Sequence, residues 1–366
     1  WGMFWSLGFM WNIKNEAFLK DIEWLTSAQV KLSTGTSGNS EIPYYDHLAL
    51  VSGDANYNDE AGIYPSQSGN EELSWEQTWA NNVGVSFGLY NRVNVNVDFY
   101  HKKTTNMLML VPQSYAITGV GNRWDNIGAM MNRGVEIAID GDVIRTKDFT
   151  WNLSANVSYN KNKLLELYNG VEEYVNSTTG LKYVVGHSVR EYFMNRYAGV
   201  NPANGDALWY TADGELTTEF REEDKVMTGK SFDSPWVGGF GTSLMWKGLS
   251  LSAQFSWMAK RYVMNNDRFF EESNGLYSAY NQSKRLLYDR WKKPGDKAKF
   301  KSISLTESTP MSSRFVMKEN YLSIESVRLG YQFDSKWLKK ALRISSLNIN
   351  MYMNSIARFS TLEDER

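Results

Sequence analysis

Residues 151–160, WNLSANVSYN, alternate apolar and polar side chains without interruption, and this period of two constrains the fold more than any other feature. Successive side chains of a β-strand project to opposite faces, so one face of this segment is apolar and the other carries asparagine and serine. The apolar face must avoid water. It can do so inside a soluble sandwich, or by facing lipid around a closed membrane barrel whose polar face lines the lumen. The alternation alone leaves both folds open.

The same alternation recurs along the chain and predicts about ten strands. In chain order they are residues 1–11, 27–35, 83–89, 93–99, 135–139, 151–160, 236–246, 249–257, 315–333 and 343–357. Pairs such as 83–89 and 93–99 are separated by only a few residues, which is typical of a hairpin with a tight turn.

The connections between these strands alternate between short and long. The short ones are residues 12–26, 90–92, 145–148, 247–248 and 334–342, and the long ones are residues 36–70, 111–129, 161–235 and 260–313. Outer-membrane barrels have short periplasmic turns and long extracellular loops, a segregation that soluble sandwiches do not usually show. The sequence therefore predicts an all-β fold, a transmembrane antiparallel β-barrel with long extracellular loops.

The composition agrees with a barrel and excludes several other classes. A mean hydropathy of −0.46 would usually indicate a soluble protein. However, a membrane strand needs only about 9–11 residues, half of them apolar, and so escapes a hydropathy scan. A net charge of −2 gives no basic surface for nucleic acid, and the absence of cysteine excludes disulfides and thiol chemistry.

The direction of the strands predicts an incomplete barrel. If the short connections are periplasmic, the first strand runs inward and the last runs outward, whereas a barrel normally ends on an inward strand. About ten strands plus one missing strand make half of the roughly 22 strands of an outer-membrane transporter. We therefore expect residues 1–366 to form the C-terminal part of such a barrel, without its last strand.

Four blocks of sequence, in this order, resemble the C-terminal half of SusC-type TonB-dependent outer-membrane transporters. They are NIGAMMNRGVEIAIDGDVIRTKDFTWNLSANVSYNKNK (126–163), YAGVNPANGDALWYTADGE (197–215), DRWKKPGD (289–296) and RFVMKENYLSIESVRLGYQF (314–333). The family's plug domain and TonB box precede its barrel, and no segment of this chain matches them.

The resemblance implies TonB-dependent uptake of oligosaccharides or peptides across the outer membrane, without enzymatic activity and without a cofactor. The implied partners are a SusD-type lipoprotein lid, the N-terminal half of the barrel with its plug, the TonB complex and the lipid bilayer, with a dimer of transporter–lid pairs also implied. The alternative is a passive porin, or a surface β-barrel that acts as an adhesin or glycan-binding protein.

Aromatic side chains in or next to the long loops are the candidate ligand contacts, because a ring can pack on a sugar face or a peptide side chain. They are Trp209, Tyr210, Trp236, Tyr262, Tyr277 and Tyr280. On the predicted lumen face, Asn152 and Asn156 could bind polar solutes. The alternative for each aromatic residue is a ring that only packs within its own loop.

Other motifs give no support for metal or catalytic chemistry. Residues 54–60, DANYNDE, have the spacing of a calcium loop, but the sixth position is Asp59 instead of glycine and the twelfth is Pro65 instead of glutamate, so a solvated loop is the preferred interpretation. The three histidines lie far apart in the sequence, outside any HExxH pattern. Residues 283–291 are expected to form a short helix, and Gly205 and Gly214 are expected in tight turns.

Overall fold

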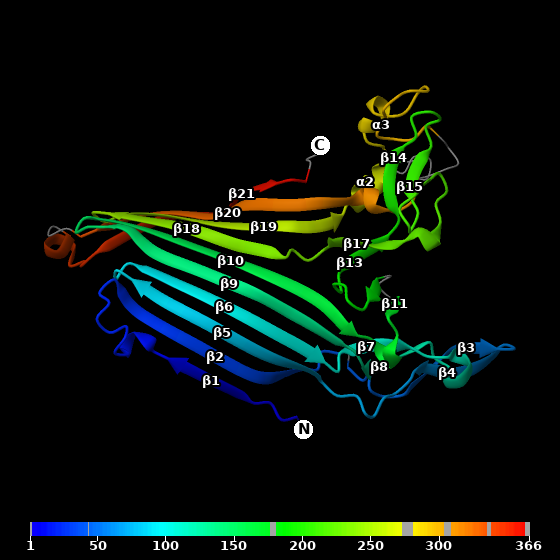
Figure 1. Cartoon of the computed structure of the whole chain (residues 1–366), viewed down its shortest axis with the longest axis horizontal. Coiled ribbons are helices and arrows are strands. Elements are labelled where there is room, and N and C mark those ends of the chain that lie inside the picture. The colour runs from blue at the N-terminus through cyan, green and yellow to red at the C-terminus, as the bar shows by residue number, and fades with distance from the viewer. Residues whose placement is uncertain are drawn as a thin grey trace. The chain divides into compact units, whose positions relative to one another are not determined.

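The computed structural model describes residues 2–42, 44–175, 181–272, 281–303, 309–334 and 338–362. One large antiparallel sheet contains ten strands, and each strand is hydrogen-bonded to the next in chain order (Figure 1). The strands are β1 (Ser6–Trp11), β2 (Leu25–Asn39), β5 (Glu76–Leu89), β6 (Val93–Thr105), β9 (Ala129–Arg145), β10 (Phe149–Glu166), β18 (Trp236–Trp246), β19 (Leu249–Met264), β20 (Val316–Phe333) and β21 (Leu347–Ser360). The ten predicted strands and the all-β class are confirmed.

The strand ends differ from those expected. β10 continues to Glu166, six residues beyond the end of the alternating pattern, because backbone pairing with β9 does not depend on alternating polarity. β21 begins at Leu347 because a short π-helix, η6 (Leu338–Leu342), and the residues after it occupy the expected start.

The strand register brings the apolar side chains of neighbouring strands onto one face. Paired residues of antiparallel strands project to the same side of a sheet. One row across β2, β5, β6, β9 and β10 consists of Val30, Val85, Val97, Ile137 and Val157. The adjacent row on the opposite face consists of Gln29, Ser86, Asn96, Ala138 and Asn156. The alternation in each strand is therefore aligned across the sheet, which gives it one apolar and one largely polar face.

The apolar face ends sharply towards the C-terminal end of β10. Its last apolar row consists of Leu32, Val83, Phe99, Val135, Tyr159 and Trp236, and the next row on that face consists of Thr34, Asn81, His101, Arg133 and Lys161. The rings of Tyr159 and Trp236 lie 4.7 Å apart between their centroids. Aromatic rings at the edge of an apolar band are the girdle that membrane barrels place at the lipid–water interface. Trp236 thus lies in the last apolar row of the sheet, next to Tyr159.

A β-bulge interrupts the register near the N-terminal end of β10. Trp151 pairs with Ile144 and Asn152 pairs with Asp142, so Val143 of β9 has no opposite residue. The extra residue returns Ile144 to the same face as Trp151, where strict alternation would have placed it on the polar face. The bulge therefore extends the apolar face by one more pair.

Several short connections are turns of two or three residues that include two consecutive residues with positive φ. Tyr90 and Asn91 both have a φ of 54°, and Lys247 and Gly248 have φ values of 45° and 93°. Turns with positive φ at both central residues match the twist of a hairpin. The candidate calcium loop is also such a turn, because it joins β3 (Leu50–Tyr57) to β4 (Glu60–Gln67). Within the described residues no group of three acidic or histidine side chains could hold a metal ion.

The chain divides into two compact units. The sheet unit comprises Trp1–Val189, Pro235–Trp257 and Leu322–Phe359, and the loop unit comprises Arg190–Ser234, Met258–Tyr321 and Ser360–Arg366. In the sheet unit, the hairpins β7 (Leu108–Pro112) with β8 (Asn122–Asn126) and β11 (Glu173–Val175) with β12 (Lys182–Val184) accompany α1 (Tyr115–Thr118), η1 (Ile13–Asn15) and η2 (Tyr168–Gly170). The sheet unit has an apolar core of Met109, Val111, Leu164 and Leu167.

The loop unit contains short strands and helices. They are β13 (Glu191–Met194), β14 (Arg196–Val200), β15 (Ala207–Tyr210), β16 (Leu216–Thr217), β17 (Val226–Ser231), α2 (Asn266–Glu272), α3 (Arg285–Tyr288), η3 (Glu222–Asp224) and η5 (Ser313–Phe315). The short helix expected within residues 283–291 is present as α3. No helix in the described parts of the chain is long and apolar enough to cross a membrane.

Candidate functional site

Strands β14, β15 and β16 form a small antiparallel sheet in the loop unit, and its two faces differ. Tyr197 pairs with Trp209, and Arg196 pairs with Tyr210. Trp209 is only 2% exposed, and its ring packs edge-on against Tyr197 and Phe220, with centroids 5.2 and 5.0 Å away. The indole of Trp209 therefore belongs to the packing of this sheet, whereas Tyr210 is exposed beneath the guanidinium of Arg196.

A cavity of about 310 Å³ opens beside this sheet, and we call it the loop pocket. It is lined by Arg196, Tyr197, Tyr210, Gly214, Thr228, Lys230 and Ser313. These residues come from β14, β15, β17, η5 and the turn after β15. Segments more than 100 residues apart in the chain thus meet around one small, partly polar space.

The turn after β15 positions the arginine of the loop pocket. Arg196 Nη2 donates hydrogen bonds to the carbonyl oxygens of Thr211 at 2.6 Å and Ala212 at 3.2 Å. Its Cζ atom lies 5.5 Å from the centroid of the Tyr210 ring. Gly214 closes the turn with a φ of 96°, which an L-residue with a side chain would adopt only under strain. The predicted turn role of Gly214 is confirmed, as is that of Gly205, whose φ is 79°.

The lysine of the loop pocket lies on β17 and contacts a second tyrosine. Lys230 Nζ is 5.8 Å from the centroid of the Tyr262 ring. The backbone carbonyl of Tyr262 accepts a hydrogen bond from the Tyr192 hydroxyl at 3.2 Å, and the backbone N–H of Met264 donates to that hydroxyl at 3.2 Å. Burial raises the pKa of Tyr192 above its ordinary value, so its hydroxyl stays protonated and can donate.

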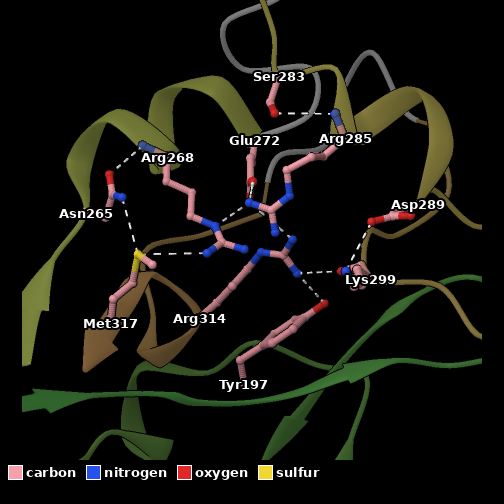
Figure 2. Close-up of polar contacts among 10 residues, drawn as sticks. All are labelled: Tyr197, Asn265, Arg268, Glu272, Ser283, Arg285, Asp289, Lys299, Arg314 and Met317. Atoms are coloured by element: carbon pink, nitrogen blue, oxygen red, sulfur yellow. Dashed lines mark hydrogen bonds and ion pairs between the residues drawn. The ribbon is translucent and has the colours of Figure 1, made fainter. Parts of the chain in front are cut away.

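A single buried carboxylate connects three segments of the loop unit (Figure 2). Glu272, at the end of α2, is 1% exposed. Its Oε2 lies 3.0 Å from Arg268 Nε and 3.5 Å from Arg314 Nη2, and its Oε1 lies 3.3 Å from Arg285 Nη1. Breaking a buried ion pair by removing one partner is strongly destabilising, because the remaining charge stays away from water. Glu272 is therefore a structural centre of this unit.

Arg314 extends this cluster to the small sheet that borders the loop pocket. Figure 2 shows its guanidinium between Glu272 and Tyr197, and Arg314 Nη1 donates to the Tyr197 hydroxyl at 2.8 Å and to the Lys299 carbonyl at 2.8 Å. Burial raises the pKa of Tyr197, while the positive charge of Arg314 acts in the opposite direction and only partly offsets it. The Tyr197 ring is thus fixed from both sides, by Arg314 and by Trp209.

A sequence profile described as "TonB dependent receptor-like, beta-barrel" matches residues 1–350. The chain belongs to this family. Its barrels are outer-membrane proteins, which agrees with the two-faced sheet, the aromatic boundary row and the alternation of short and long connections. The predicted family, outer-membrane location and antiparallel barrel architecture are thereby confirmed.

Relatives of known identity match most of this chain but extend well beyond it. TonB-dependent receptor P39 of Formosa agariphila is 27% identical over 99% of the chain, and the match covers 39% of that receptor. TonB-dependent receptor SusC of Bacteroides thetaiotaomicron is 28% identical over 92% of the chain, which covers 35% of SusC. The solved RagAB peptide transporter superposes with a TM-score of 0.88 and 30% identity, covering 98% of this chain and 40% of the transporter chain.

The structure places the other candidate contacts in different environments. On the polar face of β10, Asn152 Nδ2 donates to Asp142 Oδ1 at 3.2 Å, while Asn156 is exposed. Tyr277 and Tyr280 lie outside the described residues. Of the aromatic candidates in the described chain, Tyr210 lines the loop pocket and Tyr262 contacts its lysine, whereas Trp209 and Trp236 belong to packing and to the apolar face.

The sequence did not indicate that the two cationic residues of the loop pocket, Arg196 and Lys230, belong to a site. Arg196 stands one residue before the block YAGVNPANGDALWYTADGE, and Lys230 lies in a loop with many other charged residues. Only the pairing of β14 with β15 and of β13 with β17 arranges them around the pocket. The buried position of Glu272 was equally hidden, because it follows another glutamate, Glu271, on a short helix.

Proposed function

We propose that the protein containing this chain imports peptides or oligosaccharides across the outer membrane, with energy delivered through TonB and with a SusD-type surface lipoprotein as its lid. Family membership supports the TonB-dependent mechanism. Peptides are the preferred solute class, because the RagAB peptide transporter superposes on 98% of the chain. The chain itself would form the C-terminal part of the barrel, with plug and TonB box supplied by the rest of the protein.

The observation that carries this proposal is the alignment of the two faces across the sheet. In a bilayer every backbone N–H and C=O must be paired within the protein, so strands cross only as a closed ring. The apolar rows would then face lipid and the polar rows the lumen. A wall such as Gln29, Ser86, Asn96 and Asn156 offers hydrogen-bond donors and acceptors with little fixed charge, which suits the passage of polar solutes.

Uptake by cells that produce the full-length protein tests the proposal. Fluorescent peptide and oligosaccharide pools are supplied to cells with and without TonB. We expect uptake of one pool only when TonB is present, and co-purification of the protein with a surface lipoprotein. Uptake that persists without TonB would instead indicate a passive pore.

A double substitution on the lumen face provides a second test. Asn152→Leu combined with Asn156→Leu removes two amide groups from the polar face of β10 without changing its apolar face. We expect normal insertion of the barrel and altered uptake, because the change lies along the proposed solute path. Cells are assayed for surface exposure of the protein and for solute uptake. Normal uptake by a correctly inserted double variant would contradict the lumen assignment.

A further inference from the structure

The loop pocket contains two positive charges and no acidic side chain among its described lining residues. These charges belong to Arg196 and Lys230. Within the described parts of the chain neither side chain forms an ion pair with a carboxylate. The hydrogen bonds of Arg196 go to the neutral carbonyl groups of Thr211 and Ala212. Its Nε atom is buried and has no hydrogen-bond partner among the described residues. Because this atom is covered by protein, a ligand in the loop pocket meets the guanidinium at its other nitrogens.

The nearby acidic side chains are engaged elsewhere. Asp224 accepts a hydrogen bond from the Ala212 N–H at 3.0 Å, and Glu191 accepts one from the Gly229 N–H at 2.6 Å. Each of these carboxylates therefore supports backbone next to the loop pocket instead of entering an ion pair with its arginine or lysine. Among the described residues that line the pocket, the charged side chains are therefore both positive.

The remaining lining groups add directional contacts. Ser313 Oγ accepts a hydrogen bond from the Tyr197 N–H at 2.9 Å, which leaves its own hydroxyl proton to donate. Thr228 Oγ1 already donates to the Tyr192 carbonyl at 2.9 Å. The Tyr210 ring under Arg196 supplies an apolar surface next to the charge. Both N–H groups of Arg196 Nη2 are taken by carbonyl oxygens, so the N–H groups of Nη1 are those left to donate to an anion, while lysine acts as a point charge.

We propose that the loop pocket binds a carboxylate group of the imported solute. This inference rests on the proposed import function and specifies the chemistry of its ligand. The guanidinium of Arg196 and the ammonium of Lys230 contact the two carboxylate oxygens, and the Tyr210 ring packs on the carbon atoms beside them. A volume of about 310 Å³ accommodates one residue-sized group of a longer chain. A peptide offers such a group as its C-terminus or an acidic side chain, and an oligosaccharide offers it as a uronic acid.

Binding measurements on the purified full-length receptor test this inference. Four ligands are compared: a short peptide with a free C-terminus and one aspartate, its amidated asparagine analogue, an oligogalacturonate, and a neutral oligosaccharide of equal length. The test variant is Arg196→Gln with Lys230→Gln. The matched control is Arg221→Gln with Lys225→Gln, which removes the same charge from residues paired with Glu219 and Glu222 at the surface.

We expect the acidic peptide or the oligogalacturonate to bind more tightly than its neutral analogue. We expect the test variant to lose that preference, with affinity falling on the order of 10-fold or more, since each lost contact to a charged group contributes about one order of magnitude. The control variant should keep the preference within about 3-fold, because exposed charges contribute little. The acidic ligand that binds identifies the source of the carboxylate.

Two results would overturn the inference and are distinguishable from failure of the import proposal. Equal binding of acidic and neutral ligands by the unmodified receptor excludes a carboxylate site while leaving import intact. If the test and control variants lost equal affinity for the acidic ligand, the preference would come from the overall charge of the protein and not from the pocket. If none of the four ligands binds to the unmodified receptor, the import proposal fails, and the carboxylate site fails with it. The single variant Lys230→Glu distinguishes a lost contact from misfolding. It should bind the neutral ligand more tightly than the acidic one, and continued binding of the neutral ligand would show that the receptor is folded.

Discussion

Substitution of Val157 by arginine tests which face of β10 contacts lipid. Val157 lies in the apolar row with Ile137 and Gly238, and its neighbour Ser158 pairs with Glu136 on the opposite face. The two positions are adjacent in the chain and differ only in the side to which they point. Val157→Arg and Ser158→Arg therefore form a matched pair.

The size of the effect follows from the position of the row. Val157 is two residues from Ala155, the midpoint of the apolar run that ends at Trp151 and Tyr159. Two residues of a strand rise about 6.6 Å, which corresponds to about 5 Å of depth at a tilt of about 40°. Arginine at the midplane costs about 2–4 kcal/mol and almost nothing at the interface, so we expect about 2 kcal/mol for Val157→Arg. Ser158→Arg should change stability by less than about 0.5 kcal/mol.

The assay is thermal unfolding of the full-length receptor in lipid vesicles, followed by the loss of the folded band on a gel run without boiling. The Val157→Arg variant should unfold at a lower temperature, and the Ser158→Arg variant at the temperature of the unmodified protein. Equal losses, or a larger loss for Ser158→Arg, would refute the assignment of the two faces.

Two further predictions concern the loop unit. Glu272→Gln should destabilise it by about 3 kcal/mol, because three guanidinium groups lose their buried counter-charge, whereas the exposed Glu271→Gln should have almost no effect. Hydrogen exchange of α2 and α3 measures this, and equal exchange in the two variants would contradict it. The raised pKa of Tyr197 means that the unfolded chain releases this proton at a lower pH than the folded one, so stability is lost as the pH rises above about 10. Tyr197→Phe should reduce this alkaline loss, to which Tyr192 also contributes, while also losing the hydrogen bond from Arg314. An unchanged alkaline profile in that variant would exclude Tyr197 as a source.

The large sheet could be predicted from the sequence because its signal is local. A strand with one face in lipid and the other in water has to alternate, and residues 151–160 do so visibly. The tight turns could also be predicted, since residues 247–248 and 90–92 each connect two alternating segments with too few residues for a longer connection. Position along the chain was enough to give the order of the strands, because each one pairs with its neighbours in sequence.

The loop unit could not be predicted in the same way. Its strands are only two to six residues long and lie in a folded unit without a continuous apolar face, so they show no period of two. Its contacts join distant segments, as between Arg314 and Tyr197, which are 117 residues apart. The sequence indicated that aromatic residues gather in these loops, but whether Trp209 is buried or Tyr210 is exposed depends on the pairing of β14 with β15.

The aligned rows of the sheet also restrict how the length of such a chain can change during evolution. One residue inserted in the middle of β10 would move every later side chain of that strand to the other face, and would place asparagine in lipid and valine in the lumen. An insertion inside a strand is therefore tolerable only in steps of two, or together with a bulge like that at Val143. The loops are not restricted to insertions of an even number of residues. Length differences among homologous barrels should accordingly be even-numbered within the strands and unrestricted between residues 167 and 235.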